Sequence, residues 1–468
     1  MNRIRFLVPV LMLLLILSAC CRQEELRPKY VFYFIGDGMG LAQAIAAEAF
    51  QSSLNNEDIE PLSFRRFPVT GLATTYAANR FITGSAAAGT ALATGSKTNI
   101  NRIGLDPSGE VPLLSIAYRA KDKGMKVGII SSVSIDHATP ASFYANEPDR
   151  NMNFEIGLDL AESGFDFFGG GGFLKPNGLV DGDSVNLIEY ILEKGYRYIN
   201  NREEFEGLTP AEQPVVFTNP QLTGGASMYY AIDQPEGYIT LADITAKAIE
   251  YLDNDKGFFM MVEGGKIDWV CHANDVASVV HEVIDFSAAV EEAVKFYKQH
   301  PDETLIIVTA DHETGGLALG TRSMGYKSQF ALLEHQDISG EGFNDILKKW
   351  KEDNQADELD FNNFMELLEE HFGLGGSDAP LPMTEEEIKE LGDLYQSSGL
   401  NTFSEYESYS IITYEATTLM AKKAGFGWTT SSHTGIAVPV YAIGVNESAF
   451  SGNIDNTDIP KIIWTSMD

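Results

Sequence analysis

The chain has 468 residues, of which 44% are hydrophobic and 21% charged, a composition typical of a globular protein with a large core. Its formal net charge of −34 disfavours nucleic acid or an anionic membrane surface as a partner, since both would repel it. A phosphate-bearing ligand would therefore need local cations.

Residues 1–19 have the features of an export signal. Arg3 and Arg5 precede an apolar run from Phe6 to Leu17, which is shorter than the roughly 20 residues of a membrane-spanning helix. Leu17 to Cys20 resembles the lipobox of bacterial lipoproteins, which implies cleavage before Cys20 and acylation of that cysteine. We therefore expect a protein of the periplasm or cell envelope, lipid-anchored to a membrane, with a linker over residues 20–29. The alternative is a cleaved signal without lipid.

Short apolar runs without polar alternation predict strands that are buried on both faces. Helical patterns lie between them, for example over residues 284–300, so we expect an α/β fold: a three-layer sandwich with a mainly parallel central sheet flanked by helices. A single domain over residues 30–468 should carry insertions near 165–235 and 336–405. The predicted strands are KYVFYFIGDG at 29–38, GMKVGIISS at 124–132, GFFMMVEGG at 257–265, TLIIVTADH at 304–312 and VPVYAIG at 438–444.

Acidic side chains stand where three of these strands end. They are Asp37, Glu263 and Asp311, which is followed by His312. Open α/β sheets bind ligands at the carboxyl ends of their strands, so these side chains should meet in one crevice. Clustered carboxylates repel one another unless cations hold them, which favours a metal site. Polar turns with capping aspartates are the alternative.

Asp268 and His272 are four residues apart, which places both side chains on one face of a helix. Such a pair can also be a simple surface contact, but Glu263 at the preceding strand end makes a metal site the better interpretation. His433 lies in a small polar loop before the last predicted strand. Zinc favours imidazole and carboxylate while magnesium favours oxygen, so the mixed set fits more than one kind of ion.

The segment FITGSAAAGTALATG, residues 81–95, places Ser85 before a run of small residues. As the first residue of a helix, Ser85 would stand where backbone N–H groups point toward an anion. Coordination to zinc would also remove the proton of its hydroxyl and make it a nucleophile. The alternative is a helix N-cap without catalytic role.

Six motifs in order resemble the alkaline phosphatase family, from about residue 30 to 445. They are IGDGMG, TGSAAAGTALATG, DHATPASFYANEPDR, MVEGGKIDWVCHAND, TADHETGG and SSHTG. The resemblance implies two zinc ions and one magnesium ion. It assigns Asp268, His272 and His433 to the first zinc, and Asp37, Asp311 and His312 to the second zinc beside Ser85. It assigns Thr139 and Glu263 to the magnesium, which Asp37 would share.

The resemblance also assigns a phosphate-clamping role to Arg150, thirteen residues beyond His137. A surface arginine is the alternative. Gly84 stands where many members of the family carry an acidic residue, so no side chain there can orient Arg150. His137 and Trp269 replace the aspartate and lysine of the enteric bacterial form. We expect both behind the magnesium ligands, although His137 could instead favour a different third ion.

The resemblance implies hydrolysis of small phosphate monoesters through a phosphoserine on Ser85, in a protein family whose members are usually homodimers. A phosphodiesterase or a sulfatase of the same superfamily is an alternative. A sulfatase needs a CxPxR-like setting that GSAAAG lacks, and a diesterase would more often lack Arg150 and the magnesium ligands. A lipoprotein that stores metal or phosphate would need neither Ser85 nor Arg150.

Overall fold

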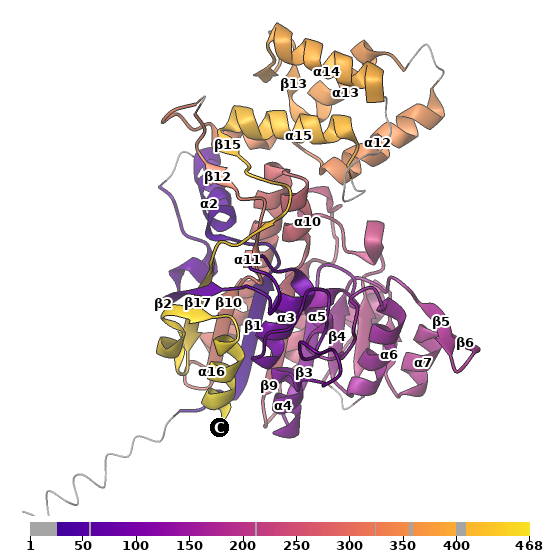
Figure 1. Cartoon of the computed structure of the whole chain (residues 1–468), viewed down its shortest axis with the longest axis vertical. Helices are drawn as coiled ribbons and strands as arrows, with labels where there is room; N and C mark the ends of the chain where they lie inside the picture. The colour runs from indigo at the N-terminus through magenta and orange to yellow at the C-terminus, as the bar shows by residue number, and fades with distance from the viewer. Residues whose placement is uncertain (1–25, 56–57, 211–212, 323, 355–358, 399–408) are drawn as a thin grey trace, which may run out of the picture.

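A ten-stranded sheet forms the centre of the protein (Figure 1). The computed structural model describes residues 26–55, 58–210, 213–322, 324–354, 359–398 and 409–468, so the expected signal peptide and Cys20 lie outside the described residues. The strand order is β18-β2-β17-β10-β1-β9-β3-β4-β8-β7. The strands are β1 Tyr30–Gly36, β2 Val69–Thr74, β3 Lys126–Ser131, β4 Phe167–Gly170, β7 Arg197–Ile199, β8 Val215–Thr218, β9 Phe258–Gly264, β10 Thr304–Thr309, β17 Val438–Gly444 and β18 Gly452–Asp455.

Strand β17 runs antiparallel to both of its neighbours, β10 and β2. The other strand pairs described in this sheet are parallel. The predicted α/β fold with a mainly parallel sheet is therefore confirmed. All five predicted strands are present, as β1, β3, β9, β10 and β17.

Helices cover both faces of the sheet (Figure 1). Successive strand residues point to opposite faces: the ring of Phe34 packs on Phe286 of α11, while that of Tyr33 packs on Phe143, just after α5. The helices around the sheet are α2 Leu41–Asn55, α3 Ser85–Thr94, α4 Ile116–Asp122, α5 Ala138–Ala141, α6 Asn153–Ser163, α7 Leu187–Glu193, α8 Arg202–Glu206, α9 Leu241–Leu252, α10 Lys266–His272, α11 Val276–Tyr297 and α16 Asp458–Met467.

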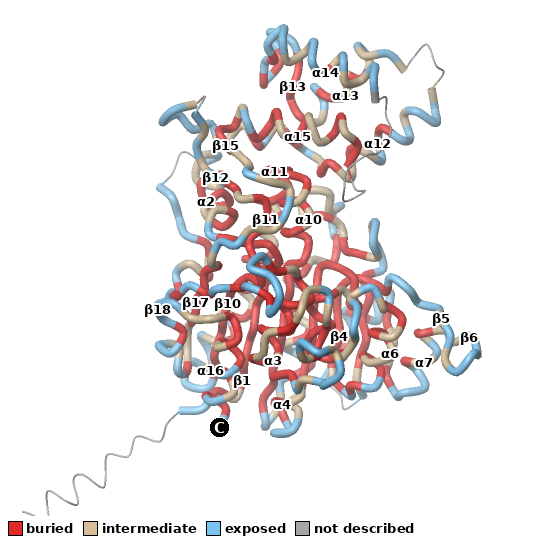
Figure 2. The backbone as a smooth tube through the Cα atoms, in the orientation of Figure 1, coloured by how far each residue is buried: buried red, intermediate tan, exposed pale blue. Residues whose placement is uncertain are grey.

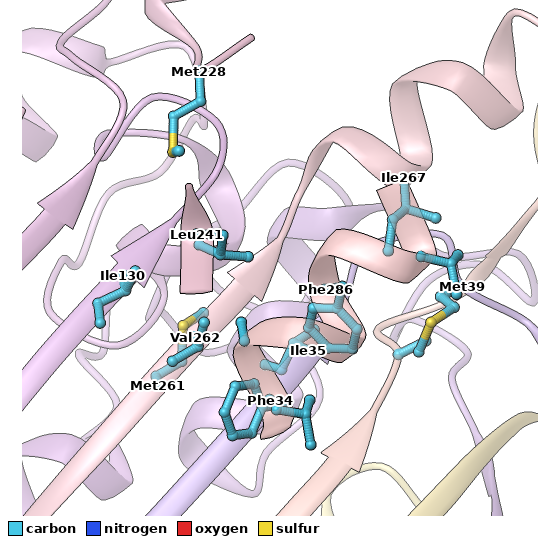
Figure 3. Close-up of a cluster of buried hydrophobic side chains, with 14 of the residues drawn as sticks. Phe34, Ile35, Met39, Ile130, Met228, Leu241, Met261, Val262, Ile267 and Phe286 are labelled. Carbon is cyan, nitrogen blue, oxygen red and sulfur yellow. The ribbon is translucent and has the colours of Figure 1, made fainter. Parts of the chain in front are cut away.

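The hydrophobic core lies on the central strands, where every residue of β1, β9 and β10 is buried (Figure 2). Between β1 and α11, Phe34, Met39, Ile267 and Phe286 belong to one apolar cluster (Figure 3). Both faces of these strands need apolar side chains because helices cover both, which explains why the sequence runs show no alternation.

Part of residues 165–235, where the sequence predicted an insertion, belongs to the central sheet. Strands β4, β8 and β7 extend the central sheet beyond β3, with α6, α7 and α8 between and beside them. These strands are only three or four residues long, too short to stand out as apolar runs. The hairpin of β5 Asn177–Val180 and β6 Asp183–Asn186 is paired outside the sheet.

A group of helices stands apart from the sheet in the C-terminal third of the chain (Figure 1). It comprises α12 Gly340–Asp353, α13 Phe361–Phe372, α14 Glu385–Ser398 and α15 Ile411–Ala424, with the short pair β13 Leu374–Gly375 and β14 Leu381–Pro382. A second short pair, β12 Ala318–Leu319 and β15 Phe426–Gly427, lies near its base. Among the described residues, none of the helices combines the length and the apolar character that a membrane span requires.

Candidate active site

Ser85 is the first residue of α3, and Gly84 is the N-cap. Ser85 is therefore inside the helix rather than its cap, as the sequence predicted. The small residues of α3 allow the helix to lie close to α5: a Cβ on Gly89 would lie 2.8 Å from Ser142 Oγ and 3.2 Å from Thr139 Cα. This close approach brings the start of α3 beside the ends of the central strands.

A first group of possible metal ligands consists of Asp268, His272 and His433. Asp268 and His272 lie one turn apart on α10, while His433 belongs to β16 His433–Thr434, which pairs with β11 Glu313–Thr314. The Nε2 atoms of the two histidines are 3.1 Å apart. They lie 3.3 and 3.6 Å from the carboxylate oxygens of Asp268.

Backbone carbonyls hold both of these imidazole rings by their Nδ1 atoms. His272 Nδ1 lies 2.6 Å from the carbonyl oxygen of Ser431, and His433 Nδ1 lies 2.9 Å from that of Thr83. A carbonyl oxygen can only accept a hydrogen bond, so each Nδ1 carries a proton. In the neutral rings, both Nε2 lone pairs then face Asp268, which is the arrangement of histidines that bind a metal.

A second group consists of Asp37 after β1 and Asp311 and His312 after β10. His312 Nε2 lies 3.4 Å from Asp37 Oδ1, 3.2 Å from Asp311 Oδ2 and 3.4 Å from Ser85 Oγ. The hydroxyl of Thr314 is 3.2 Å from His312 Nδ1 and donates a hydrogen bond to Asp268. Since that hydroxyl proton is used on Asp268, His312 Nδ1 is the donor to Thr314, and its Nε2 lone pair faces the carboxylates.

A third group consists of Asp37, His137 and Glu263. His137 Nδ1 lies 3.9 Å from Glu263 Oε1, and Ser131 donates a hydrogen bond to the other oxygen of Glu263. Thr139 donates to Asp37 Oδ2 at 3.4 Å, so it lies at the same place. The structure therefore brings together all eight residues that the resemblance assigned to metal ions.

The carboxylates of these groups are buried without enough partners. Asp37 Oδ1, Asp311 Oδ2 and Glu263 Oε1 accept no hydrogen bond from the described residues. Burial, with repulsion from neighbouring carboxylates, raises the pKa of Asp37 well above its ordinary value, that of Glu263 to about 8 and that of Asp311 to about 7. Unpaired buried charges are costly, and divalent cations would stabilise them, so the donor set fits zinc and magnesium.

Asp268 differs from the other carboxylates because histidines surround it. Burial would raise its pKa, but His272, His433 and His312 outweigh that effect and hold the pKa well below its ordinary value. For His272, burial alone would lower the pKa, but the charge of Asp268 outweighs burial and the pKa is raised. Asp268 is therefore ionised, as a metal ligand must be.

Arg150 reaches the same site and is oriented by His137. Its Nη2 atom lies 2.9 Å from His137 Nε2. Arginine only donates hydrogen bonds, so Nε2 accepts and the proton of the neutral ring is on Nδ1. Burial and the charge of Arg150 lower the pKa of His137 to about 3, which keeps the ring neutral. In this tautomer neither nitrogen offers a free lone pair to an ion, which favours His137 as a support for Arg150.

The first group lines one open pocket of about 790 Å³, together with Ser85, His137 and Arg150. The second group lies next to this pocket, since His312 Nε2 is 3.4 Å from Ser85 Oγ. Ser85, Arg150 and His433 line it, as does Trp269, whose ring packs edge-on against His137 at a centroid distance of 6.2 Å. Trp269 thus lies beside the third group, as expected from the sequence. Glu341 also lines the pocket, which the sequence had not indicated.

Several supporting residues escaped the sequence analysis. Thr314 was detectable, since alternation along an extended segment places it on the same side as His312. Glu313 was not: it accepts hydrogen bonds from Gln43 Nε2 and Thr434 Oγ1 and so ties β11 to β16. The roles of the backbone carbonyls of Thr83 and Ser431 could not be predicted either, because every residue type has such a carbonyl.

Comparisons with known proteins agree with this geometry. A family model described as "Alkaline phosphatase" matches residues 28–164 and 176–467. Alkaline phosphatase 3 of Bacillus subtilis (strain 168) is 31% identical over 465 residues, covering 95% of this chain and 90% of that protein. The alkaline phosphatase of Schizosaccharomyces pombe (strain 972) is 29% identical, with 93% and 81% covered. The solved structure of a cold-active alkaline phosphatase from a psychrophilic Shewanella sp. aligns with a TM-score of 0.78 at 28% identity, covering 94% of this chain and all of that chain.

Proposed function

Since the chain belongs to the alkaline phosphatase family and is a phosphatase, we propose that it hydrolyses small phosphate monoesters through a phosphoserine intermediate on Ser85, with two zinc ions and one magnesium ion. One observation carries the proposal: a potential nucleophile, an arginine and the first group of possible metal ligands line the same pocket, and His312 of the second group lies 3.4 Å from Ser85 Oγ. Asp268, His272 and His433 are assigned to the first zinc.

The remaining ligands divide between the second zinc and the magnesium. Asp37, Asp311 and His312 would hold the second zinc beside Ser85, and Thr139 and Glu263 would hold the magnesium together with Asp37. When bound, the ions would act as Lewis acids that lower the pKa of a hydroxyl group and neutralise charge that develops on the phosphoryl oxygens.

The side chains of the pocket account for the rest of the chemistry. Arg150 binds two phosphoryl oxygens through its planar guanidinium, held in position by His137. Ser85 Oγ attacks phosphorus, the ester oxygen leaves, and the proton lost by the Ser85 hydroxyl balances the proton gained by the departing alcohol. Water then attacks the phosphoserine and releases inorganic phosphate. The start of α3 adds backbone N–H groups and the positive end of the helix dipole.

The test compares three aryl esters at alkaline pH, with metal analysis of the purified protein. We expect fast hydrolysis of an aryl phosphate, little of a bis-aryl phosphate or aryl sulfate, and about two zinc ions per chain. Ser85→Ala should lose at least about 100-fold in activity, because it removes the nucleophile. Ser397→Ala, on the exposed side of α14, should behave as the unmodified protein. Equal or faster diester turnover would overturn the assignment.

We also propose that the protein is exported and anchored by a lipid on Cys20, at the periplasm or cell envelope. The support is the apolar run and the Leu17 to Cys20 segment, which resemble a lipoprotein signal. Labelling of growing cells with a radioactive fatty acid should mark the protein, and Cys20→Ser should abolish the label. An unlabelled but cleaved protein would contradict the anchor.

A homodimer is proposed from the family resemblance. Exposed apolar side chains are consistent with it: Phe81 is 76% and Ile436 57% exposed, and the Phe81 ring lies against Gly435. Light scattering on the purified protein should give about twice the mass of one chain. A single-chain mass across the micromolar range would reject the dimer.

A further inference from the structure

The pocket at Ser85 is also lined by residues that belong to none of the metal-ligating groups. They are Trp269 of α10, Gly224 and Gly225, and Glu341, the second residue of α12. These residues come from three separate parts of the chain, and Glu341 belongs to the helices that stand apart from the sheet. Those helices thus supply a charged side chain to the pocket that contains Ser85.

Glu341 is held in a defined position. Thr223 Oγ1 donates a 2.8 Å hydrogen bond to Glu341 Oε1. A Cβ on Gly224 would lie 2.8 Å from the same oxygen, and a Cβ on Gly225 would lie 3.0 Å from the Trp269 ring. The two glycines therefore let the loop lie directly against both side chains.

The beginning of α12 is itself anchored. The N-cap Ser339 donates hydrogen bonds from its backbone and its hydroxyl to Asp233, and Gly340 donates to Asp275. A carboxylate in the first turn is also stabilised by the helix dipole. Glu341 thus presents a negative charge from a fixed helix end rather than from a loose surface loop.

The pocket is consequently polarised along its length. Arg150 contacts His137, whose ring packs on Trp269. Gly225 then lies against Trp269, and its neighbour Gly224 lies against Glu341, so the acidic side chain is separated from Arg150 by this row of residues. A phosphate monoester bound at Ser85 must direct its alcohol half away from the metal-ligating groups, toward open pocket volume. That volume offers an indole wall and a carboxylate, which attract an ammonium group and repel a carboxylate or a second phosphate.

We propose that Glu341 and Trp269 form a subsite for the alcohol half of the substrate and that Glu341 selects alcohols with a cationic ammonium group over anionic ones. The inference rests on the proposed phosphomonoesterase function. It identifies the substrate class as esters with an anionic phosphate at one end and a positive charge at the other.

A structural role is the competing explanation for Glu341. The buried Lys266 lies behind it, with Nζ 3.3 Å from the centroid of the Tyr230 ring, and burial lowers its pKa to about 8 while Glu341 opposes that shift. No ion pair within 4 Å joins Lys266 to a carboxylate among the described residues. If Glu341 serves only to compensate Lys266, its removal should lower the melting temperature without changing selectivity.

The experiment measures kcat/KM for 2-aminoethyl phosphate and for phosphoglycolate, and takes their ratio. Comparing this ratio between variants cancels the intrinsic reactivity of the two esters. Glu341→Gln should lower the cationic-to-anionic ratio about fivefold, a magnitude expected for a partly exposed charge pair, and Glu341→Lys should lower it further. Thr223→Ala keeps the charge but releases the carboxylate, so it should give a smaller decrease.

Glu352→Gln is the matched control, because it removes the same charge from the exposed far end of α12. It should leave the ratio within about twofold of the unmodified protein. An unchanged ratio in Glu341→Gln and Glu341→Lys, or an equal change in Glu352→Gln, would overturn the inference. Hydrolysis of aryl phosphate by the unmodified protein tests the phosphomonoesterase function separately from the Glu341 subsite. If this hydrolysis is absent, the proposed function itself has failed.

Discussion

The hydroxyl of Thr314 donates a 2.5 Å hydrogen bond to Asp268 Oδ1 and thereby connects the first and second groups of possible metal ligands. Thr314 lies opposite His433 in the β11–β16 pair and accepts from His312 at 3.2 Å. One side chain thus touches a ligand of each group.

Thr314→Val keeps the shape of the side chain but removes the hydroxyl. His312 should then lose the partner that holds its tautomer, and the affinity for zinc should fall about tenfold, as for other residues that orient metal ligands. Competition of the metal-free protein with a chromogenic chelator measures this affinity. Thr465→Val on the exposed side of α16 is the control. Unaltered zinc affinity in Thr314→Val would show that the hydroxyl does not position the ligands.

His137→Phe keeps an aromatic ring but removes the acceptor for Arg150. The guanidinium should become less ordered, so KM for aryl phosphate and the inhibition constant for inorganic phosphate should both rise about tenfold. In a double-mutant cycle with Arg150→Ala, the two effects should not add, since the histidine acts through the arginine. Additive effects would mean that His137 acts elsewhere, for example on the third ion.

Gly89→Ala places a methyl group 2.8 Å from Ser142 Oγ and 3.2 Å from Thr139 Cα. α3 must then move away from α5, which displaces Ser85, and overpacking of this kind costs about 1–3 kcal/mol. We expect a lower melting temperature and a reduced kcat, both partly restored by adding Ser142→Ala. Gly376→Ala is the control because a Cβ there meets nothing within 4 Å. Full activity in Gly89→Ala would argue against this close contact.

Asp285→Asn should stabilise the protein at alkaline pH. Burial and the nearby Asp243 raise the pKa of Asp285 to about 7, whereas an unfolded chain has a value of about 4. The folded state therefore binds the extra proton, so this contribution to stability is lost as pH rises from about 4 to about 7 and stays absent above.

Asp285→Asn removes this loss of stability at high pH. Because the side chain is only half-buried, we expect the free energy of unfolding to increase by about 1 kcal/mol above pH 8. Unfolding by denaturant at pH 5 and pH 9 measures it: the gain should be larger at pH 9. The exposed Asp302→Asn should show no such difference. An equal change in Asp285→Asn at both pH values would rule out titration as the cause.

Asp275→Ala should loosen the attachment of the α12–α15 helices. The carboxylate of Asp275 accepts hydrogen bonds from Gln336 Nε2, Gly340 N and Tyr409 Oη, as well as from its own helix. Losing a buried charged acceptor costs about 1.5–3 kcal/mol. Hydrogen exchange should accelerate over residues 336–354 and 409–424, and Tyr409→Phe should have a smaller effect. Unchanged exchange would place the anchoring contacts elsewhere.

Much of the fold was predictable from local pattern. The runs at 30–36, 258–264 and 304–309 are buried throughout and apolar except near their ends, because both faces of a covered parallel strand meet helices. Within the segment 165–235, the strands β4, β7 and β8 were not predicted because they have too few residues to show a pattern. Their place in the sheet depends on pairing with β3 and with one another rather than on their own composition.

The sequence by itself determined which groups can ligate and where they lie along the chain: Asp37, Glu263 and Asp311 at strand ends, and the Asp268 and His272 pair one helical turn apart. Local geometry suffices for that, since strand polarity and the helical repeat are properties of short segments. Only the tertiary structure decided the partners of each group, such as His137 for Arg150, and the presence of Glu341 in the pocket lining. Hydrogen bonds depend on distances of a few tenths of an ångström and on direction, and those arise from packing between segments far apart in the chain.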